Sequence, residues 1–162
     1  MPEYALKKIG PSKEAVPALV RALENRDSSV RQSAAEILGG MGIEAKEAMP
    51  ALIEALYDSD LSDKAVEALK KIGPSKEAVP LLAKALKYPR FSIRMNAAEV
   101  LGSIGEEAVP ALFQALEDRD SHVRESAQKA LRKIKPRTLP ALLEFSEGFM
   151  LLSPKDEGRI YL

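Results

Sequence analysis

Ala-Leu-Lys-Lys-Ile-Gly-Pro-Ser-Lys-Glu-Ala-Val-Pro is a stretch that occurs twice in this chain, from Ala5 to Pro17 and, unchanged, from Ala68 to Pro80. An identical run of this length does not recur by chance, so it marks a repeated structural unit. Prolines that follow an apolar residue extend the repeat along the chain at Pro17, Pro50, Pro80, Pro110 and Pro140. They are 33, 30, 30 and 30 residues apart. A period near thirty residues is typical of a two-helix repeat.

The residues between the prolines predict the two helices. After each proline, apolar residues three and four positions apart form one face of a short first helix, which starts close to the proline. A polar break follows, and then a second apolar stripe with a small residue in its middle, which lets neighbouring helices approach closely. The stripe runs through Val30, Ala34 and Leu38, then Ile93, Ala97 and Leu101, then Val123, Ala127 and Leu131.

Polar residues and glycines mark the expected helix ends. Asp27 and Asp120 stand three residues before an apolar stripe, where a carboxylate can cap the second helix. The third repeat has Tyr88-Pro89-Arg90-Phe91 in that place. First helices are expected to be capped by Ser12 and Ser75, and second helices to end near Gly39, Gly73 and Gly102, with turns at Gly42 and Gly105.

Composition excludes several classes of protein. Lys plus Arg and Asp plus Glu both number 24, aromatic residues make up 5%, and Trp is absent, which disfavours a nucleic-acid binder. No apolar run approaches the roughly 18 to 20 residues of a membrane span. The start of the chain lacks a signal-peptide pattern and there is no cysteine, so we expect a cytoplasmic protein.

The motif Asp-x-x-Val-Arg-x-x-Ala-Ala-x-x-Leu-Gly, best seen at residues 27–39, resembles HEAT-like repeats, in particular the short type of the phycobilin lyases. The resemblance implies an all-α, right-handed α-α superhelix of about five two-helix repeats in a single domain, residues 1–162. The expected parts are a half repeat at 1–10, full repeats at 11–42, 43–73, 74–105 and 106–135, and a capping helix with a tail at 136–162.

In this family the Asp and Arg residues of successive repeats form a ladder of hydrogen bonds and ion pairs. Carried over by position, the resemblance implies a structural ladder of Asp27, Arg31, Asp58, Arg94, Asp120 and Arg124. Arg90 stands at one Asp position and Ser62 at one Arg position, so the ladder is expected to be interrupted near the middle of the chain.

The sequence offers no catalytic constellation. His122 is the one histidine and is expected to be a surface residue, since it lacks the repeated His-Glu pairs of the HEAT-like hydroxylases. Without cysteine there is no thiolate nucleophile and no cysteine zinc site, and no glycine-rich phosphate loop is present. We therefore expect no enzyme activity, no metal and no cofactor. The alternative is a phycobilin-lyase-like accessory subunit that handles a tetrapyrrole or another small molecule.

The expected function is that of a non-enzymatic scaffold for a protein or peptide, which binds the concave face lined by the second helices. Residues offset from the buried stripes line that face: Tyr4, Gln32, Glu36, Asp63, Glu67, Met95, Glu99, Glu125 and Lys129. Their charge predicts an acidic groove and a basic partner, although carboxylates on helix surfaces also serve solubility alone. Homodimerisation through the terminal repeats or the C-terminal tail is a further possibility.

Overall fold

The computed structural model describes residues 11–73 and 75–134, in which every regular element is an α-helix or a 3-10 helix. The expected half repeat at 1–10, which contains Tyr4, and the expected cap and tail at 136–162 lie outside the described residues. The chain divides into two compact units, Met1–Pro74 and Ser75–Leu162. The expectation of one continuous domain stays a prediction.

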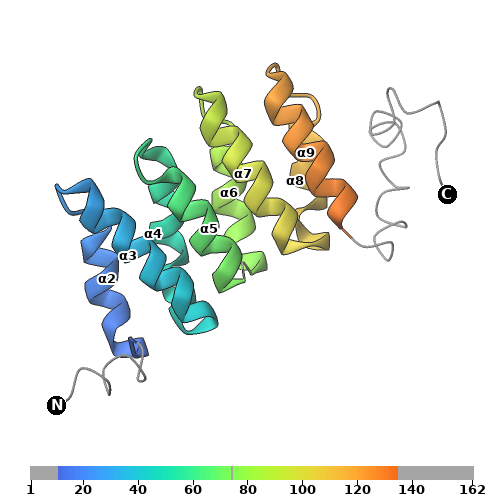
Figure 1. Cartoon of the computed structure of the whole chain (residues 1–162). Helices are drawn as coiled ribbons and strands as arrows, with labels where there is room; N and C mark the ends of the chain where they lie inside the picture. The colour runs from blue at the N-terminus through green and yellow to red at the C-terminus, as the bar shows by residue number, and fades with distance from the viewer. Residues whose placement is uncertain (1–10, 74, 135–162) are drawn as a thin grey trace, which may run out of the picture. The chain divides into compact units, whose positions relative to one another are not determined.

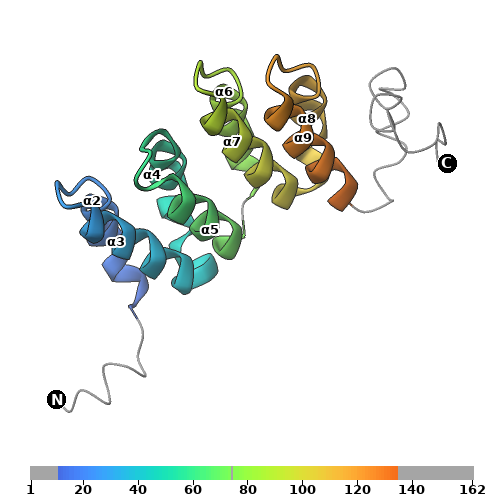
Figure 2. The ribbon, with the colours of Figure 1, turned by 45° about the horizontal axis from the view of Figure 1, so that its top comes forward.

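The first unit contains two helix pairs (Figure 1). The first repeat begins with a 3-10 turn, Lys13–Ala15, and continues with α2 (Val16–Ala22) and α3 (Ser28–Met41). The second repeat consists of a 3-10 segment, Gly42–Ala48, then α4 (Met49–Glu54), a 3-10 turn, Ala55–Tyr57, and α5 (Ser62–Ile72). Within this unit, α2 and α4 form one layer and α3 and α5 form the other (Figures 1 and 2).

The second unit repeats this plan. The third repeat has a 3-10 turn, Lys76–Ala78, then α6 (Val79–Ala85) and α7 (Phe91–Ile104). The fourth has a 3-10 turn, Glu106–Ala108, then α8 (Val109–Ala115) and α9 (Ser121–Lys133). Consecutive two-helix repeats of this kind make the fold an all-α solenoid, as the sequence predicted.

The repeated proline begins each first helix. Pro17, Pro50, Pro80 and Pro110 occupy the first or second position of α2, α4, α6 and α8. A proline costs little there, because the backbone N–H that it lacks would have no partner within the helix. The prediction from the proline spacing is confirmed for these four helices.

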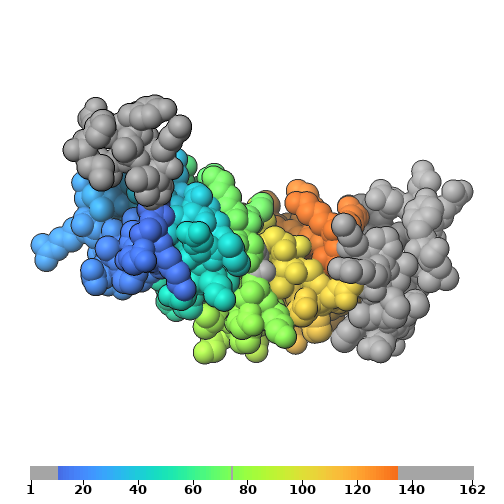
Figure 3. Space-filling model, turned by 90° about the horizontal axis from the view of Figure 1, so that it is seen from below, coloured from blue at the N-terminus to red at the C-terminus, as the bar shows by residue number. Residues whose placement is uncertain are grey.

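The apolar stripes of the second helices form the core of each unit. Leu38, Leu101 and Leu131 are buried together with the alanines of the same stripes. In the space-filling view, the blue and cyan residues of the first unit lie against each other, as do the yellow and orange residues of the second (Figure 3). Val30 departs from the prediction, because 38% of it is exposed whereas Val123 is completely buried. Val123 lies on α9, which packs against α7 of the preceding repeat. Among the described residues, α3 has no second helix of a preceding repeat to cover Val30.

Two glycines that were expected to end helices lie inside them. A Cβ atom on Gly39 of α3 would lie 2.9 Å from Ala68 Cα, and one on Gly102 of α7 would lie 2.6 Å from Ala130 Cβ. These glycines therefore allow close contact between second helices of consecutive repeats. α5 ends at Gly73 as expected, whereas α3 and α7 end at Gly42 and Gly105; the φ angles of Gly73, Gly42 and Gly105 are 82°, 59° and 101°.

The expected serine caps are not formed. Ser12 and Ser75 precede the 3-10 turns, but neither side chain makes a capping hydrogen bond. The Ser12 hydroxyl donates instead to the carboxylate of Glu14, and this bond, together with the backbone N–H of Glu14, lowers the pKa of that carboxyl. A 3-10 turn therefore takes the place of a side-chain cap at these starts.

Candidate functional site

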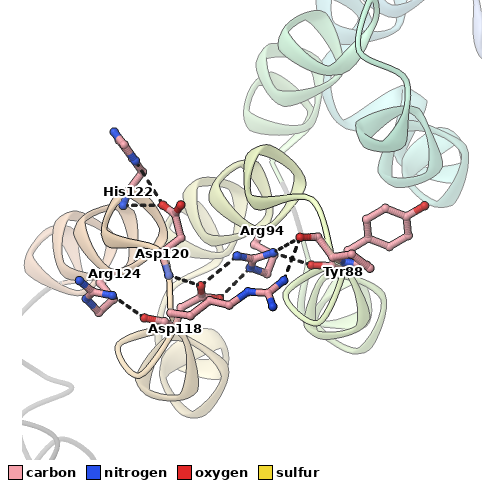
Figure 4. A network of polar contacts seen from close by, with 8 residues as sticks. Tyr88, Arg94, Asp118, Asp120, His122 and Arg124 are labelled. Carbon is pink, nitrogen blue, oxygen red and sulfur yellow. Dashed lines mark hydrogen bonds and ion pairs between the residues drawn. The ribbon is translucent and has the colours of Figure 1, made fainter.

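Arg94 holds together the loops between paired helices in the second unit (Figure 4). It is 4% exposed, and it is the one charged residue that is buried among those the structure describes. Its Nε and Nη2 donate to the two carboxylate oxygens of Asp118, at 2.8 and 3.1 Å. Its Nη1 donates to the backbone carbonyls of Tyr88 at 2.7 Å and Pro89 at 2.6 Å. One guanidinium thus ties the loop of its own repeat to that of the next repeat.

Arg31 makes the corresponding contacts in the first unit. Its Nη1 donates to the backbone carbonyls of Asn25 at 2.9 Å and Arg26 at 3.2 Å. Its Nε lies 3.0 Å from Asp58 Oδ2, as an ion pair without the alignment of a hydrogen bond. The Asp58 side chain is 35% exposed, against 11% for that of Asp118. Water therefore screens this pair more than the pair in the second unit.

Asp27 and Asp120 cap their own helices, and the ladder expected from the resemblance is corrected accordingly. Asp27 Oδ1 accepts hydrogen bonds from the Ser29 backbone N–H at 2.9 Å and the Ser29 hydroxyl at 2.7 Å. Asp120 Oδ1 accepts from the His122 backbone N–H at 2.8 Å. In the second unit the carboxylate that faces Arg94 is Asp118, which the sequence reasoning missed.

Hydrogen bonds at these caps lower both carboxyl pKa values. The Ser29 hydroxyl and then the Ser29 backbone N–H hold the pKa of Asp27 below its ordinary value. For Asp120, partial desolvation raises the pKa, but the backbone N–H and the ring of His122 outweigh it, so the pKa is lowered as well. The folded chain therefore stabilises the charged form of both side chains relative to the protonated form, as expected of helix N-caps.

Asp58 and Asp118 make the same pair of contacts in their repeats. Asp58 Oδ1 accepts from the Asp60 N–H at 2.9 Å, while Oδ2 faces Arg31. Asp118 Oδ1 likewise accepts from the Asp120 N–H at 2.9 Å, while both carboxylate oxygens accept from Arg94. A signal for Asp118 exists in the sequence, because Asn25, Asp58 and Asp118 all stand two residues after the last leucine of a first helix.

Arg124 also serves its own loop, since its Nη1 donates to the backbone carbonyl of Asp118 at 2.6 Å. His122 is exposed, its Nδ1 lies 3.2 Å from Asp120 Oδ1, and its ring centroid lies 5.7 Å from that of Phe91. In residues 11–73 and 75–134, no group of three or more His, Cys, Asp or Glu side chains could hold a metal ion. The hydrogen bonds and ion pairs between the loops stabilise the fold.

The second-helix face of the first unit is the exposed side of α3 and α5. Glu36, Asp63 and Glu67, which were expected to bind a partner, are exposed on it. Lys64 Nζ lies between the two glutamates, 4.0 Å from Glu36 Oε2 and 3.8 Å from Glu67 Oε2. Gln32 is half-buried and donates to the backbone carbonyl of Asp60 at 2.8 Å, so its amide fastens a loop.

The second-helix face of the second unit is the exposed side of α7 and α9. Glu99, Glu125 and Lys129 are exposed on it, and Met95 is half-buried. Lys129 Nζ lies 3.1 Å from Glu125 Oε1, one turn away on the same helix. Each second-helix face therefore carries carboxylates that a lysine partly neutralises. Lys64 was missed by the sequence reasoning, although its position three residues before Glu67 is a signal for such a pair.

Comparison with known proteins supports the fold. A family model described as HEAT repeats matches residues 4–70 and 58–132. The crystal structure of an engineered protein from the Northeast Structural Genomics Consortium is similar, with a TM-score of 0.53, 22% identity, and coverage of 88% of this chain and 74% of that one. A second engineered protein from that consortium aligns with a TM-score of 0.49 and 22% identity, over 91% of this chain and 47% of its own length. No curated protein matches the chain closely enough to count as a relative.

None of the helices in residues 11–73 and 75–134 is both long enough and apolar enough to cross a bilayer.

Proposed function

This chain belongs to the HEAT-repeat family, whose members are commonly scaffolds for other proteins, and from that premise we propose that it binds a protein or peptide partner through its second-helix faces. The proposed role is non-enzymatic. The partner carries basic groups that meet Glu36 and Glu67 in the first unit and Glu99 and Glu125 in the second. The family match supports the class of function, and the charges of the two faces support the chemistry of the partner.

The observation that carries the proposal is a contrast between two sets of carboxylates. Those in the loops are used by the fold, since Asp27 and Asp120 cap helices and Asp58 and Asp118 face arginines. Glu36 and Glu67 are instead exposed in the middle of their helices, and their partner is Lys64 at 3.8 to 4.0 Å.

Such distant surface pairs contribute little to stability, with a median of about 0 to 1 kcal/mol. The two glutamates can therefore exchange Lys64 for a basic group of a partner at little cost.

Affinity capture from a lysate of the source cells tests the proposal. The bait is the full chain, compared with a variant that carries Glu36→Lys, Glu67→Lys and Glu99→Lys. We expect the parent to retain specific proteins, identified by mass spectrometry, and the variant to lose them because the faces then repel a basic partner.

A matched variant controls for net charge. Glu24→Lys, Glu54→Lys and Glu107→Lys change the charge by the same amount at exposed positions that lie outside the second helices. This control is expected to retain the partners, and circular dichroism checks that all three proteins fold. Loss of the same partners from both variants, or from neither, would show that the second-helix faces are not the binding site.

A further inference from the structure

The loop between α6 and α7 departs from the other three loops that connect paired helices. Arg90 occupies the cap position of α7 with φ −79° and ψ 121°, close to the −81° and 119° of Asp27. Its side chain makes no capping hydrogen bond. The helix dipole also disfavours a cation at this end of a helix. The third repeat therefore gives up a stabilising cap that the same backbone would accept.

Two large side chains stand on either side of Arg90 where other repeats have small polar ones. Tyr88 occupies the position of Asn25 and Asp118, and Phe91 that of Ser28 and Ser121. Tyr88 is 41% exposed and Phe91 is 43% exposed. The contribution of Tyr88 to the network of Arg94 is its backbone carbonyl, which accepts a hydrogen bond at 2.7 Å. Exposed aromatic residues that replace a favourable cap indicate that the loop serves binding.

An open surface hollow of about 510 Å³ lies beside Tyr88, lined by Leu86, Lys87, Tyr88, Pro89, Arg94, Asp118 and Arg119. Arg119 Nη2 donates to the Pro89 carbonyl at 3.2 Å, which holds that guanidinium at the edge of the hollow. Lys87, Arg90 and Arg119 are exposed cations of this loop and of the next, whereas the charges of Arg94 and Asp118 are already matched. The site thus combines apolar surface with an excess of positive charge.

We propose that this basic-aromatic patch, made of Lys87, Tyr88, Arg90, Phe91 and Arg119, binds an acidic peptide segment. Carboxylates of the peptide meet the three cations, and an apolar side chain of the peptide packs on Tyr88 and Phe91. A nucleic-acid strand fits less well, because three exposed cations give few phosphate contacts. The ligand proposed for this patch has the opposite charge to the one proposed for the second-helix faces.

Nuclear magnetic resonance of the full chain tests this site directly. The probe is the capped peptide Glu-Asp-Leu-Glu-Glu-Phe-Asp-Glu, titrated against the isotope-labelled protein. We expect chemical-shift changes centred on the backbone amides of Lys87, Tyr88, Arg90 and Phe91 and of residues 119–122. The same peptide with lysine at every acidic position, and a twelve-residue oligouridine, are expected to leave these amides unchanged. Shifts that are stronger with the oligouridine would overturn the peptide assignment in favour of nucleic acid.

A variant that restores the repeat separates binding from folding. Tyr88→Asn, Arg90→Asp and Phe91→Ser give the loop the residues found at the same positions of the first repeat. Because the variant regains the cap of α7, its midpoint of thermal unfolding is expected to rise by about 4 °C. Its affinity for the acidic peptide is expected to fall by about tenfold or more, through lost aromatic contact and reversed charge.

Arg90→Asn is the matched single variant, since Asn caps a helix without adding negative charge. It is expected to gain thermal stability and to lose part of the affinity. If the restored variant binds the acidic peptide as tightly as the parent, or if the parent shows no shifts at residues 87–91, the proposal is wrong.

Discussion

At the scale of single residues, the degree of burial decides how much each of the two Arg–Asp pairs contributes to the stability of the fold. Arg94 and Asp118 share two hydrogen bonds and little water, whereas Arg31 meets Asp58 through one ion pair at a wetter position. Removal of one partner from a buried pair leaves an uncompensated charge, which costs far more than the loss of an exposed pair. Chemically similar pairs are thus expected to differ in their effect on stability.

Asp118→Asn is expected to lower the free energy of unfolding by about 3 kcal/mol, because the buried guanidinium of Arg94 then lacks its counter-charge. Asp58→Asn is the matched control and is expected to cost clearly less, since that side chain is 35% exposed. Urea unfolding followed by circular dichroism measures both values. Equal losses in the two variants would contradict the ranking by burial.

The two capping carboxylates, Asp27 and Asp120, are expected to make the stability of the chain depend on pH. The pKa values of Asp27 and Asp120 are lowered in the folded state, so both carboxylates stabilise the fold at pH values above their pKa in the unfolded chain. This stabilisation is lost as the pH falls through their pKa in the folded chain. The double variant Asp27→Asn, Asp120→Asn keeps the caps without titrating there. Its stability is expected to fall less than that of the parent between about pH 5 and pH 2.5.

Unfolding curves at several pH values within that range measure the difference. Parallel pH profiles would mean that these two carboxylates do not contribute to acid sensitivity.

At the scale of helices, close packing between repeats depends on glycine facing alanine. Gly102→Ala is expected to destabilise the fold by about 2 kcal/mol, because the new Cβ would lie 2.6 Å from Ala130 Cβ and 2.9 Å from its Cα. Gly40→Ala in α3 is the control, since a Cβ there meets nothing within 4 Å. It is expected to stabilise the chain by about 0.7 kcal/mol through helix propensity.

Thermal and urea unfolding measure both substitutions. A neutral Gly102→Ala variant would show that α7 and α9 are not held at the close distance described here.

The sequence predicts the helices well because proline and apolar spacing are local signals. It does not separate a packing glycine from a terminating one. The sequence Gly39-Gly40-Met41-Gly42 does not distinguish the roles of its three glycines. The structure shows that Gly42 has a positive φ and that Gly39 faces Ala68. The division of tasks between Asp118 and Asp120 is equally hidden, because it depends on which carboxylate reaches Arg94 across two repeats.

At the scale of the whole molecule, zero formal net charge conceals local differences. The second-helix faces carry Glu36, Glu67 and Glu125 beside single lysines, whereas the basic-aromatic patch carries an excess of cations. Helix periodicity predicted which glutamates are exposed. The spacing of Lys64 and Glu67 signals one ion pair, but the sequence does not show that Lys64 also approaches Glu36 on the neighbouring helix. Two surfaces of opposite charge suit a scaffold that meets chemically different partners.

The most direct test of the central claim is photo-crosslinking from two exposed glutamates of the second repeat. The photoreactive residue p-benzoylphenylalanine replaces Glu67 on α5 in one protein and Glu54 on α4 in the other. After irradiation in a lysate of the source cells, a discrete protein adduct is expected from position 67 and none from position 54. An adduct from position 54 alone, or equal adducts from both, would contradict binding through the second-helix face.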